Sequence, residues 1–178
     1  MPTGMIDTGT EQLLAEVRDG VALITLNRPA ARNALGDTIT PALRRQIRDR
    51  GADPDVRALL ITGAGDAFCA GGDVKAMGQR REGSPLTRDE KISQLKERQR
   101  TLTGALTGLR KPTVAALPGP AAGAGLVVAI LADISIAGKR AKIVDGHPRL
   151  GVAAGDVAAI IWPLLTSMAK AKYYLMTC

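Results

Sequence analysis

The chain has 178 residues, of which 46% are hydrophobic and 23% are charged, so it is long enough to fold around one sizeable core. Only 2% of the residues are aromatic, and this scarcity argues against the stacking platforms that bind single-stranded nucleic acid. The net charge of +7 is compatible with a nucleic acid, an anionic surface or a phosphate-bearing ligand. Because the basic residues are scattered, without a zinc or helix-turn-helix signature, we expect a solvated basic surface and no nucleic-acid or metal partner.

Cysteine usage and the N-terminus indicate a protein of the reducing cytoplasm. Cys69 and Cys178 are too few for a disulfide framework. The first residues carry acids where a signal peptide needs a charged start and an apolar core. The segment 113–132 has the length of a membrane span, but Pro118, Pro120 and several glycines interrupt it. We therefore expect a cytoplasmic protein without a membrane partner.

The first ten residues are expected to be loose, and the first regular element is a β-hairpin. Apolar runs at Leu13–Val17 and Val21–Asn27 flank Arg18-Asp19-Gly20, and Asp-Gly between apolar runs is a strong signal for a tight turn. The polar segment 27–33 then predicts a loop.

Helices and strands alternate along the rest of the chain. In the first half we expect a helix capped by Gly36 or Asp37 and ending near Arg50, a strand at 56–62 and a mobile surface segment at 77–86. The capping box Thr87-x-x-Glu90 then opens a helix, which is followed by a strand at Thr113–Leu117, a helix from about Ala124 to Ala132 and a strand at Asp133–Ala137. The last part is expected to form a strand and loop at 141–155 and helical segments from Asp156 and after Ser167. Strands followed by helices recur without a linker, so the sequence predicts one α/β domain.

Two loops rich in glycine and alanine each follow a predicted strand. They span residues 63–72 and 118–125, and the second leads into an apolar helix. The first is not a dinucleotide-binding loop, because Phe68 stands where that fingerprint needs its third glycine. If the two strands are neighbours, backbone N–H groups from both loops can point at one anion. From these residues alone, a ligand site and a plain connection remain equally open.

Four segments carry a resemblance to a known family: LNRPAARNAL (26–35), AFCAGGDVKAM (67–77), KPTVAALPGPAAGAG (111–125) and ADISIAGKRAKI (132–143). Their order and spacing are similar to those of the crotonase superfamily, the enoyl-CoA hydratase/isomerase proteins. The resemblance implies a crotonase-like α/β fold of the ClpP/crotonase type, a spiral of repeated ββα units over residues 1–178. It also implies a coenzyme A thioester as the substrate, a role in fatty acid metabolism, no further cofactor, and a homotrimer or hexamer.

The resemblance assigns roles to individual residues. Gly72 and Ala124 match the two positions whose N–H groups hold the thioester oxygen as an enolate forms. The second position is usually glycine in the family, and alanine keeps the N–H while narrowing the room for an acyl chain. The residues expected near the adenine and pantetheine of coenzyme A are Ala30, Arg32, Ala70, Asp73, Val74 and Lys75, with Arg32 or Lys75 meeting phosphates. For each of these, the role of a plain loop residue remains equally open.

The sequence departs from the family at both glutamates that position and activate water in the hydratases. Val127 stands in place of the first glutamate and His147 in place of the second. A valine cannot transfer protons, so the two-carboxylate mechanism is not available as usually written. The candidates left nearby are His147, Asp145 and Asp156. Asp156 could act as base or nucleophile with His147 as its proton partner, or it could only cap a helix, and His147 could be a hydrogen-bonded loop residue.

The leading hypothesis is a crotonase-like acyl-CoA enzyme of the hydratase or isomerase type. Two alternatives stay open: a non-catalytic acyl-CoA-binding or assembly subunit, and a thioester or carbon–carbon hydrolase of the same fold. Family members usually continue beyond the Leu-Met-Thr-Cys ending into helices that cover the acyl pocket. We therefore expect that C-terminal helical part to be short or missing, which would leave an apolar face uncovered.

Overall fold

The main structural element is a six-stranded sheet in the order β1-β2-β3-β4-β5-β7. The computed structural model describes residues 4–76, 86–153 and 157–178. The strands of this sheet are β1 (Gly4–Ile6), β2 (Leu13–Arg18), β3 (Val21–Leu26), β4 (Ala58–Gly63), β5 (Thr113–Leu117) and β7 (Ile134–Ala137). β1, β2 and β3 pair antiparallel, whereas β3, β4, β5 and β7 run parallel. The expectation that residues 1–10 are loose is wrong for residues 4–6, because the backbone of β1 pairs with the edge of β2, and residues 1–3 lie outside the described residues.

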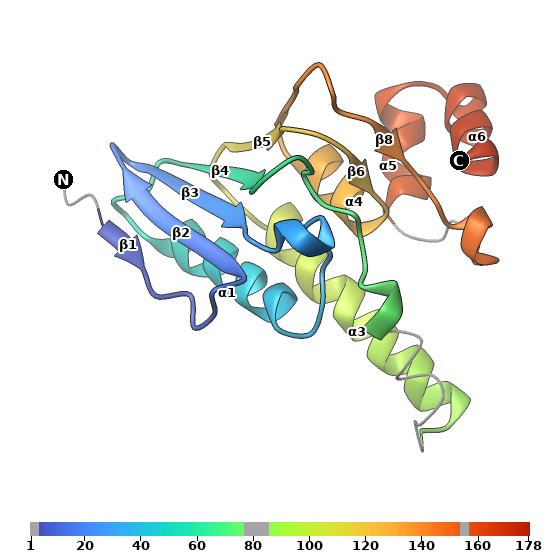
Figure 1. Ribbon diagram of the computed structural model, residues 1–178, viewed down its shortest axis with the longest axis horizontal. Coiled ribbons are helices and arrows are strands. Elements are labelled where there is room, and N and C mark those ends of the chain that lie inside the picture. Colours follow the sequence, from blue (N-terminus) through green and yellow to red (C-terminus); the bar gives the residue numbers. More distant parts are fainter. Residues whose placement is uncertain (1–3, 77–85, 154–156) are drawn as a thin grey trace.

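The helices are α1 (Ile39–Ala52), α3 (Arg88–Thr107), α4 (Ala124–Leu131), α5 (Ala158–Leu165) and α6 (Met168–Thr177). α5 packs against α4 and α6, and both α5 and α6 lie to one side of the sheet (Figure 1). α1 lies against β2, β3 and β4, and α3 lies between α1 and α4. The order of strands and helices confirms the predicted α/β class. Among the described residues, no helix combines the length and apolar character that crossing a membrane requires.

The hairpin and the helix caps form largely as the sequence predicts. Asp19 and Gly20 both have positive φ, 50° and 79°, as the two central residues of a type I′ turn require. Thr87 and Glu90 form the expected capping box at the start of α3. α1 begins at Ile39 rather than after Gly36 or Asp37, and its N-cap residue makes no side-chain cap.

α3 is only partly the amphipathic helix that the sequence suggests. Its C-terminal half packs into the core, where Leu102 and Leu106 are 8% and 5% exposed. Its N-terminal half extends away from the sheet (Figure 1), and Ile92 is 40% exposed. The expectation that Ile92 faces inward is therefore wrong, because no described part of the chain covers that end. The expected mobile segment 77–86 falls almost wholly outside the described residues.

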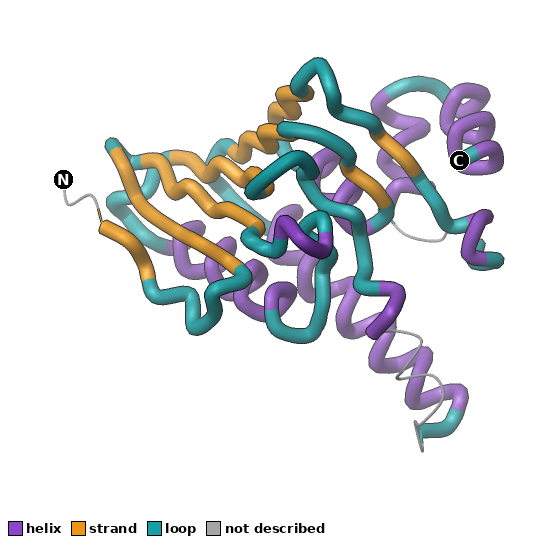
Figure 2. Tube along the Cα trace, viewed as in Figure 1, coloured by secondary structure: helices purple, strands orange, loops and turns teal. Residues whose placement is uncertain are grey.

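A second, narrower layer of extended segments lies beside the large sheet and carries the loops (Figure 2). Leu35 bridges to Gly72 and Cys69 bridges to Ala121, both in parallel, and β6 (Ala121–Ala122) pairs in parallel with β8 (Ile143–Val144). Each of these segments follows a strand of the large sheet, and the next helix comes after it. This arrangement confirms the predicted repeat of ββα units.

Candidate functional site

The two glycine- and alanine-rich loops lie side by side. The N–H of Ala122 donates to the carbonyl oxygen of Cys69 at 2.9 Å, and the N–H groups of Phe68 and Cys69 donate to the carbonyl oxygen of Pro120 at 3.0 and 3.2 Å. Gly71 has a φ of +89°, and a Cβ at this residue would lie 2.7 Å from the Ala122 carbonyl oxygen. Such a Cβ would also lie 3.5 Å from the Ala124 nitrogen. The two backbones are therefore in direct contact next to residues 72 and 124.

The bridge between Leu35 and Gly72 determines the direction of the Gly72 N–H. The Leu35 N–H donates to the Gly71 oxygen at 2.7 Å, and the Asp73 N–H donates to the Leu35 oxygen at 3.0 Å. In a parallel bridge of this kind, the N–H of the residue between those two groups points away from the bridging partner. The Gly72 N–H therefore points to the side on which the second loop lies.

The Ala124 N–H lies at the N-terminus of α4. As the first residue of the helix, Ala124 has no intrahelical acceptor for its N–H. In the described part of the chain, neither this N–H nor that of Gly72 makes a hydrogen bond. A helix N-terminus also carries a partial positive charge that favours an anion. Two backbone N–H groups from adjacent loops are therefore left without an acceptor in the described part of the chain.

Close packing of Cys69 against α4 holds the two loops together. A Cβ on Gly125 would lie 2.5 Å from both the Cβ and the carbonyl oxygen of Cys69, so only glycine allows this approach. The Cys69 side chain is fully buried, and burial raises the pKa of its thiol to about 11, although the Gly71 N–H opposes the shift. Cys69 is therefore a neutral packing residue at neutral pH, as the sequence suggests.

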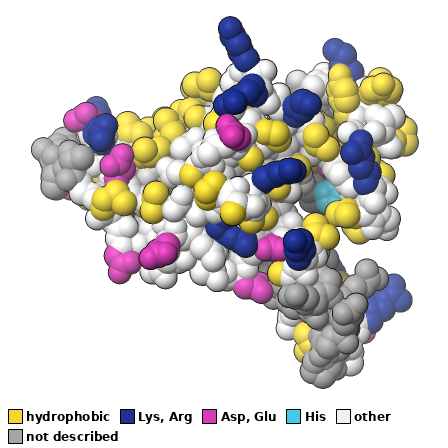
Figure 3. Space-filling model, in the orientation of Figure 1, with side chains coloured by type: hydrophobic (Ala, Val, Ile, Leu, Met, Phe, Trp, Pro, Cys, Tyr) yellow, Lys and Arg dark blue, Asp and Glu magenta, His cyan; other side chains and the backbone are white. Residues whose placement is uncertain are grey.

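His147 lies beyond β8, whose pairing directs the chain towards the N-terminus of α4. Ala122 pairs with Val144, and the Gly123 N–H donates to the Val144 oxygen at 3.2 Å. The His147 side chain, the only histidine of the chain and coloured cyan in Figure 3, is 22% exposed. Its Nδ1 lies 2.5 Å from Oδ1 of Asp145.

Asp145 is completely buried next to this histidine. Its Oδ1 accepts the backbone N–H of His147 at 3.0 Å in addition to facing Nδ1. Its Oδ2 is buried, and within the described residues it has no hydrogen-bond partner. A buried carboxyl group on a histidine nitrogen is an arrangement that can orient the ring.

Val127, which stands in place of a hydratase glutamate, and Asp156, the other candidate for proton transfer, give different outcomes. Val127 is 6% exposed in α4, so an apolar side chain occupies this position of the helix. Asp156 lies outside the described residues, and its proposed role stays a prediction. Within the described ranges, no group of three histidine, cysteine or acidic residues could hold a metal ion.

Asn33 attaches the loop after β3 to the first glycine-rich loop. It is completely buried, and its Oδ1 accepts the N–H of Arg28 at 2.8 Å. Its Nδ2 donates to the carbonyl oxygens of Ala64 and Ala67 at 2.9 and 2.8 Å. Asn33 belongs to a segment that carries the family resemblance, but no local pattern predicts the two bonds of its Nδ2, because Ala64 and Ala67 lie more than thirty residues away.

Asp73 supports the same junction through an ion pair. Its Oδ2 lies 3.1 Å from Nη2 of Arg28, whose Nη1 also donates to the Ala34 oxygen at 2.7 Å. The pKa of the Asp73 carboxyl is below its ordinary value, chiefly because its Oδ1 accepts the Ala76 N–H at 3.2 Å and also because of Arg28. These bonds give Asp73 a structural role between the loops.

The other residues expected at coenzyme A lie on the surface of these loops. Ala30, Arg32, Ala70, Val74 and Lys75 are all exposed. The Ala70 N–H donates to the Arg32 oxygen at 2.9 Å, which brings these two residues together. Lysine and arginine side chains are spread over the face in Figure 3 rather than gathered into one stripe. Contact of any of these residues with coenzyme A stays a prediction.

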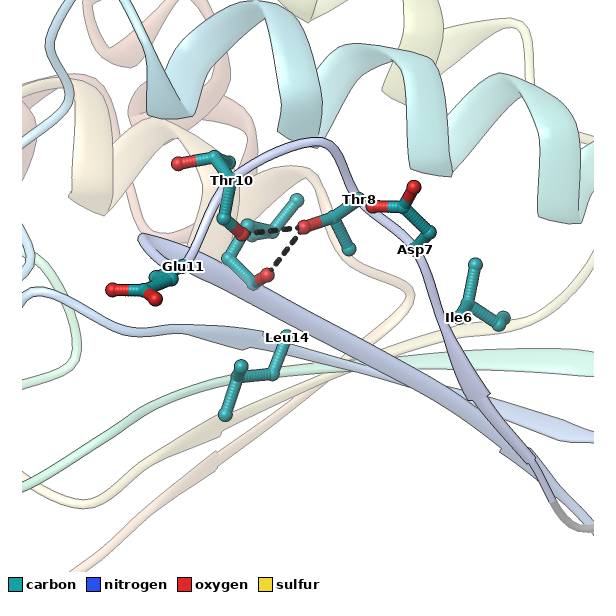
Figure 4. A pocket seen from close by; sticks show the side chains of 7 residues that line it. Ile6, Asp7, Thr8, Thr10, Glu11 and Leu14 are labelled. Atoms are coloured by element: carbon teal, nitrogen blue, oxygen red, sulfur yellow. Dashed lines mark hydrogen bonds between the residues drawn. The ribbon is translucent and has the colours of Figure 1, made fainter.

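A separate depression lies at the β1–β2 edge of the sheet (Figure 4), and its lining includes Ile6, Asp7, Thr8, Thr10, Glu11 and Leu14. Several of its polar groups are bonded within the turn: the Thr8 hydroxyl donates to the carbonyl oxygens of Thr10 and Leu13 at 2.7 and 2.6 Å. Asp7 accepts the Gly9 N–H at 2.7 Å. This depression therefore has the features of a turn and not those of a reactive site.

Comparison with known proteins gives a consistent result. The family profile described as enoyl-CoA hydratase/isomerase matches residues 16–178. The chain is 39% identical over 148 residues to the "Probable enoyl-CoA hydratase EchA14" of Mycobacterium tuberculosis, covering 83% of this chain and 55% of that protein. It is 34% identical over 162 residues to the 1,2-epoxyphenylacetyl-CoA isomerase of Escherichia coli, covering 90% of this chain and 60% of that one. The chain therefore spans little more than half the length of these curated relatives.

Solved structures agree with the sequence comparisons. The fold is similar to the crystal structure of an enoyl-CoA hydratase/isomerase from Mycobacterium paratuberculosis, with a TM-score of 0.84 and 32% identity. That match covers 94% of this chain and 66% of the other. An enoyl-CoA hydratase/isomerase from Marinobacter aquaeolei matches with a TM-score of 0.84 and 28% identity, over 94% of this chain and 64% of the other.

Proposed function

Because the chain belongs to the enoyl-CoA hydratase/isomerase family, we propose that it is a crotonase-like acyl-CoA enzyme that stabilises a thioester enolate. The observation that carries this proposal is the contact between the two loops, with Gly71 against Ala122 and Ala124. The N–H groups of Gly72 and Ala124 receive the thioester oxygen. When the α-proton leaves, its electron pair moves towards that oxygen, and the two donors stabilise the negative charge.

His147 and Asp156 provide the proton-transfer groups in this proposal. His147 takes the place of a hydratase glutamate, and imidazole is a general acid or base suited to neutral pH. Ala30, Arg32, Ala70, Asp73, Val74 and Lys75 bind coenzyme A, with Arg32 or Lys75 at the phosphates. The exposed position of these side chains, apart from the partly buried Asp73, supports this assignment. No cofactor beyond the substrate takes part, and the functional assembly is a homotrimer or hexamer, which light scattering would test.

Replacing Ala124 with proline tests the proposed oxyanion hole directly. Proline lacks the N–H, and the first helical position tolerates it because that N–H has no intrahelical acceptor. We expect kcat on an active enoyl-CoA thioester to fall about 10²–10³-fold. Ala124→Gly keeps the N–H and serves as the matched control. Equal activity in the proline and glycine variants would exclude this N–H from the mechanism.

The reaction class is tested with a panel of enoyl-CoA and other acyl-CoA thioesters. Turnover by hydration or double-bond migration supports the proposal. Failure to turn over any thioester of the panel would overturn it. The buried Val127 favours a second candidate, a non-catalytic acyl-CoA-binding subunit. Calorimetric binding without turnover would favour that candidate. Release of free coenzyme A, detected as a thiol, would instead identify a thioester hydrolase.

A further inference from the structure

The buried Asp145 is the strongest feature that the proposed function leaves without a role. A buried acidic side chain is costly to retain unless it is paired, so a purely packing role does not explain it. It lies directly beyond β8, which pairs with the segment leading into Ala124. Its only described partner residue is His147, through Oδ1.

The hydrogen-bonding chemistry of this pair restricts the histidine. An ionised carboxylate only accepts hydrogen bonds, so the ring nitrogen that faces it must carry a proton. At a separation of 2.5 Å, Nδ1 is therefore the protonated nitrogen of the neutral ring. The other nitrogen, Nε2, then holds the lone pair and is the proton acceptor.

The backbone contact makes this orientation specific. Oδ1 of Asp145 also accepts the His147 N–H at 3.0 Å, so one oxygen binds the main chain and the ring of the same residue. This double contact limits rotation of the carboxylate and fixes the oxygen opposite Nδ1. The second oxygen, Oδ2, is buried as well, and it has no hydrogen-bond partner among the described residues.

We propose that Asp145 is a positioning residue, which holds His147 in the Nδ1-protonated tautomer and stabilises the imidazolium that forms when Nε2 takes a proton. In that step an X–H bond of the substrate or of water breaks, its electron pair stays on X, and a new N–H bond forms at Nε2. Asp145 remains ionised and bonded to Nδ1–H. This role rests on the proposed function, in which His147 transfers protons, but the state of the ring can be measured without turnover.

The test uses the fact that the chain has one histidine. In protein labelled with ¹⁵N-histidine, long-range ¹H–¹⁵N correlation spectra distinguish the two neutral tautomers, because the nitrogen without a proton resonates far downfield. We expect the unsubstituted protein to show the Nδ1–H form. Asp145→Ala should shift most of the ring to the Nε2–H form, and the nearly isosteric Asp145→Asn should give a mixture. Asp66→Ala, which removes an exposed carboxylate from a neighbouring loop, should change nothing.

Two results would overturn the inference: an Nε2–H ring in the unsubstituted protein, or an unchanged tautomer in whichever Asp145 variant folds. If Asp145→Ala does not fold, the spectrum of Asp145→Asn decides. In an active preparation, Asp145→Asn should lower kcat by about tenfold or more with KM little changed, and an unchanged kcat would also count against it. Failure of the acyl-CoA panel leaves the spectra readable, so the two proposals can fail separately.

Discussion

Two neighbouring regions of the same fold differ sharply in how well they are covered. In β4, alternate residues are buried, and Leu59 and Ile61 are 0% exposed in the core cluster that also includes residues of α1 and α3. In β7, two strands along the same sheet, every residue is exposed, and Ile134 and Ile136 are 55% and 60% exposed. Twelve of the fifteen exposed large apolar side chains of the described residues lie from Ile134 onward. Thus the pairing of a parallel strand does not by itself create a core.

This difference matters because the candidate site lies at the boundary. Gly72 follows β4 of the covered region, whereas His147 lies in the exposed region and Ala124 begins α4, which contacts α5 of that region. The exposed region has its own small cluster, in which Trp162 packs with Leu126, Ala158 and Ala171. The relative position of the Gly72 and Ala124 N–H groups therefore depends on how firmly the exposed region is held against the covered region.

The largest effect is expected from truncating isoleucines in the two strands. Ile61→Ala removes a fully buried side chain from β4 and should lower the free energy of unfolding by about 2–5 kcal/mol. Ile136→Ala, the matched change in β7, should lower it by no more than about 0.5 kcal/mol, because water already reaches the side chain. Urea unfolding followed by circular dichroism measures both. Similar losses would mean that β7 is covered in solution, for example by another copy of the chain.

A second prediction concerns the contact that joins the regions. In Gly125→Ala, the new Cβ would meet Cys69, so the loops must separate, and we expect a loss of about 1–3 kcal/mol in stability together with lower activity. Gly104→Ala in α3 is the control, since no atom lies within 4 Å of its added Cβ. That change should be neutral or slightly stabilising, because alanine favours a helix over glycine. A stable and fully active Gly125→Ala protein would show that the close approach is not required.

Most strands of the large sheet were predictable from the sequence because local patterns determine them. β5 lies at Thr113–Leu117, as expected, since a short apolar run between two prolines favours a short buried strand. The capping box of α3 was equally predictable, because Thr87 and Glu90 lie within one turn of each other. The family resemblance then gave the ββα repeat, which composition and periodicity alone could not.

The features that the sequence did not predict depend on contacts that form only when the chain folds. β1 was not predicted, because its three residues are held by the edge of β2 and not by a pattern of their own. The bonds of Asn33 reach residues that become neighbours only after folding. Asp145 was recognised as a candidate near His147, but its burial and its bond to Nδ1 required the structure.

A smaller, pH-dependent effect is expected where β5 meets β7. Asp133 accepts the N–H and the hydroxyl of Thr113, both at 2.7 Å, and these bonds lower the pKa of its carboxyl from the ordinary 3.8. A group whose pKa is lower in the folded than in the unfolded chain stabilises the fold above the unfolded pKa, and this contribution is lost as the pH falls through the folded value. Asp133→Asn should therefore be less stable than the unsubstituted protein near neutral pH, and the difference should shrink as the pH falls below about 4. Urea unfolding at several pH values measures this, and a constant difference would contradict it.

The smallest expected effect concerns the chemical reactivity of two thiols, one from each region. Cys69 is fully buried between the two loops, and its pKa of about 11 leaves almost no thiolate at neutral pH. Cys178 is partly exposed at the end of α6. Iodoacetamide should therefore label Cys178 in the folded protein and Cys69 only after urea is added, with Cys178→Ser as the control that isolates Cys69. Rapid labelling of Cys69 in that variant would mean that the loops separate in the native state, and the N–H groups of Gly72 and Ala124 would then not form one preorganised site.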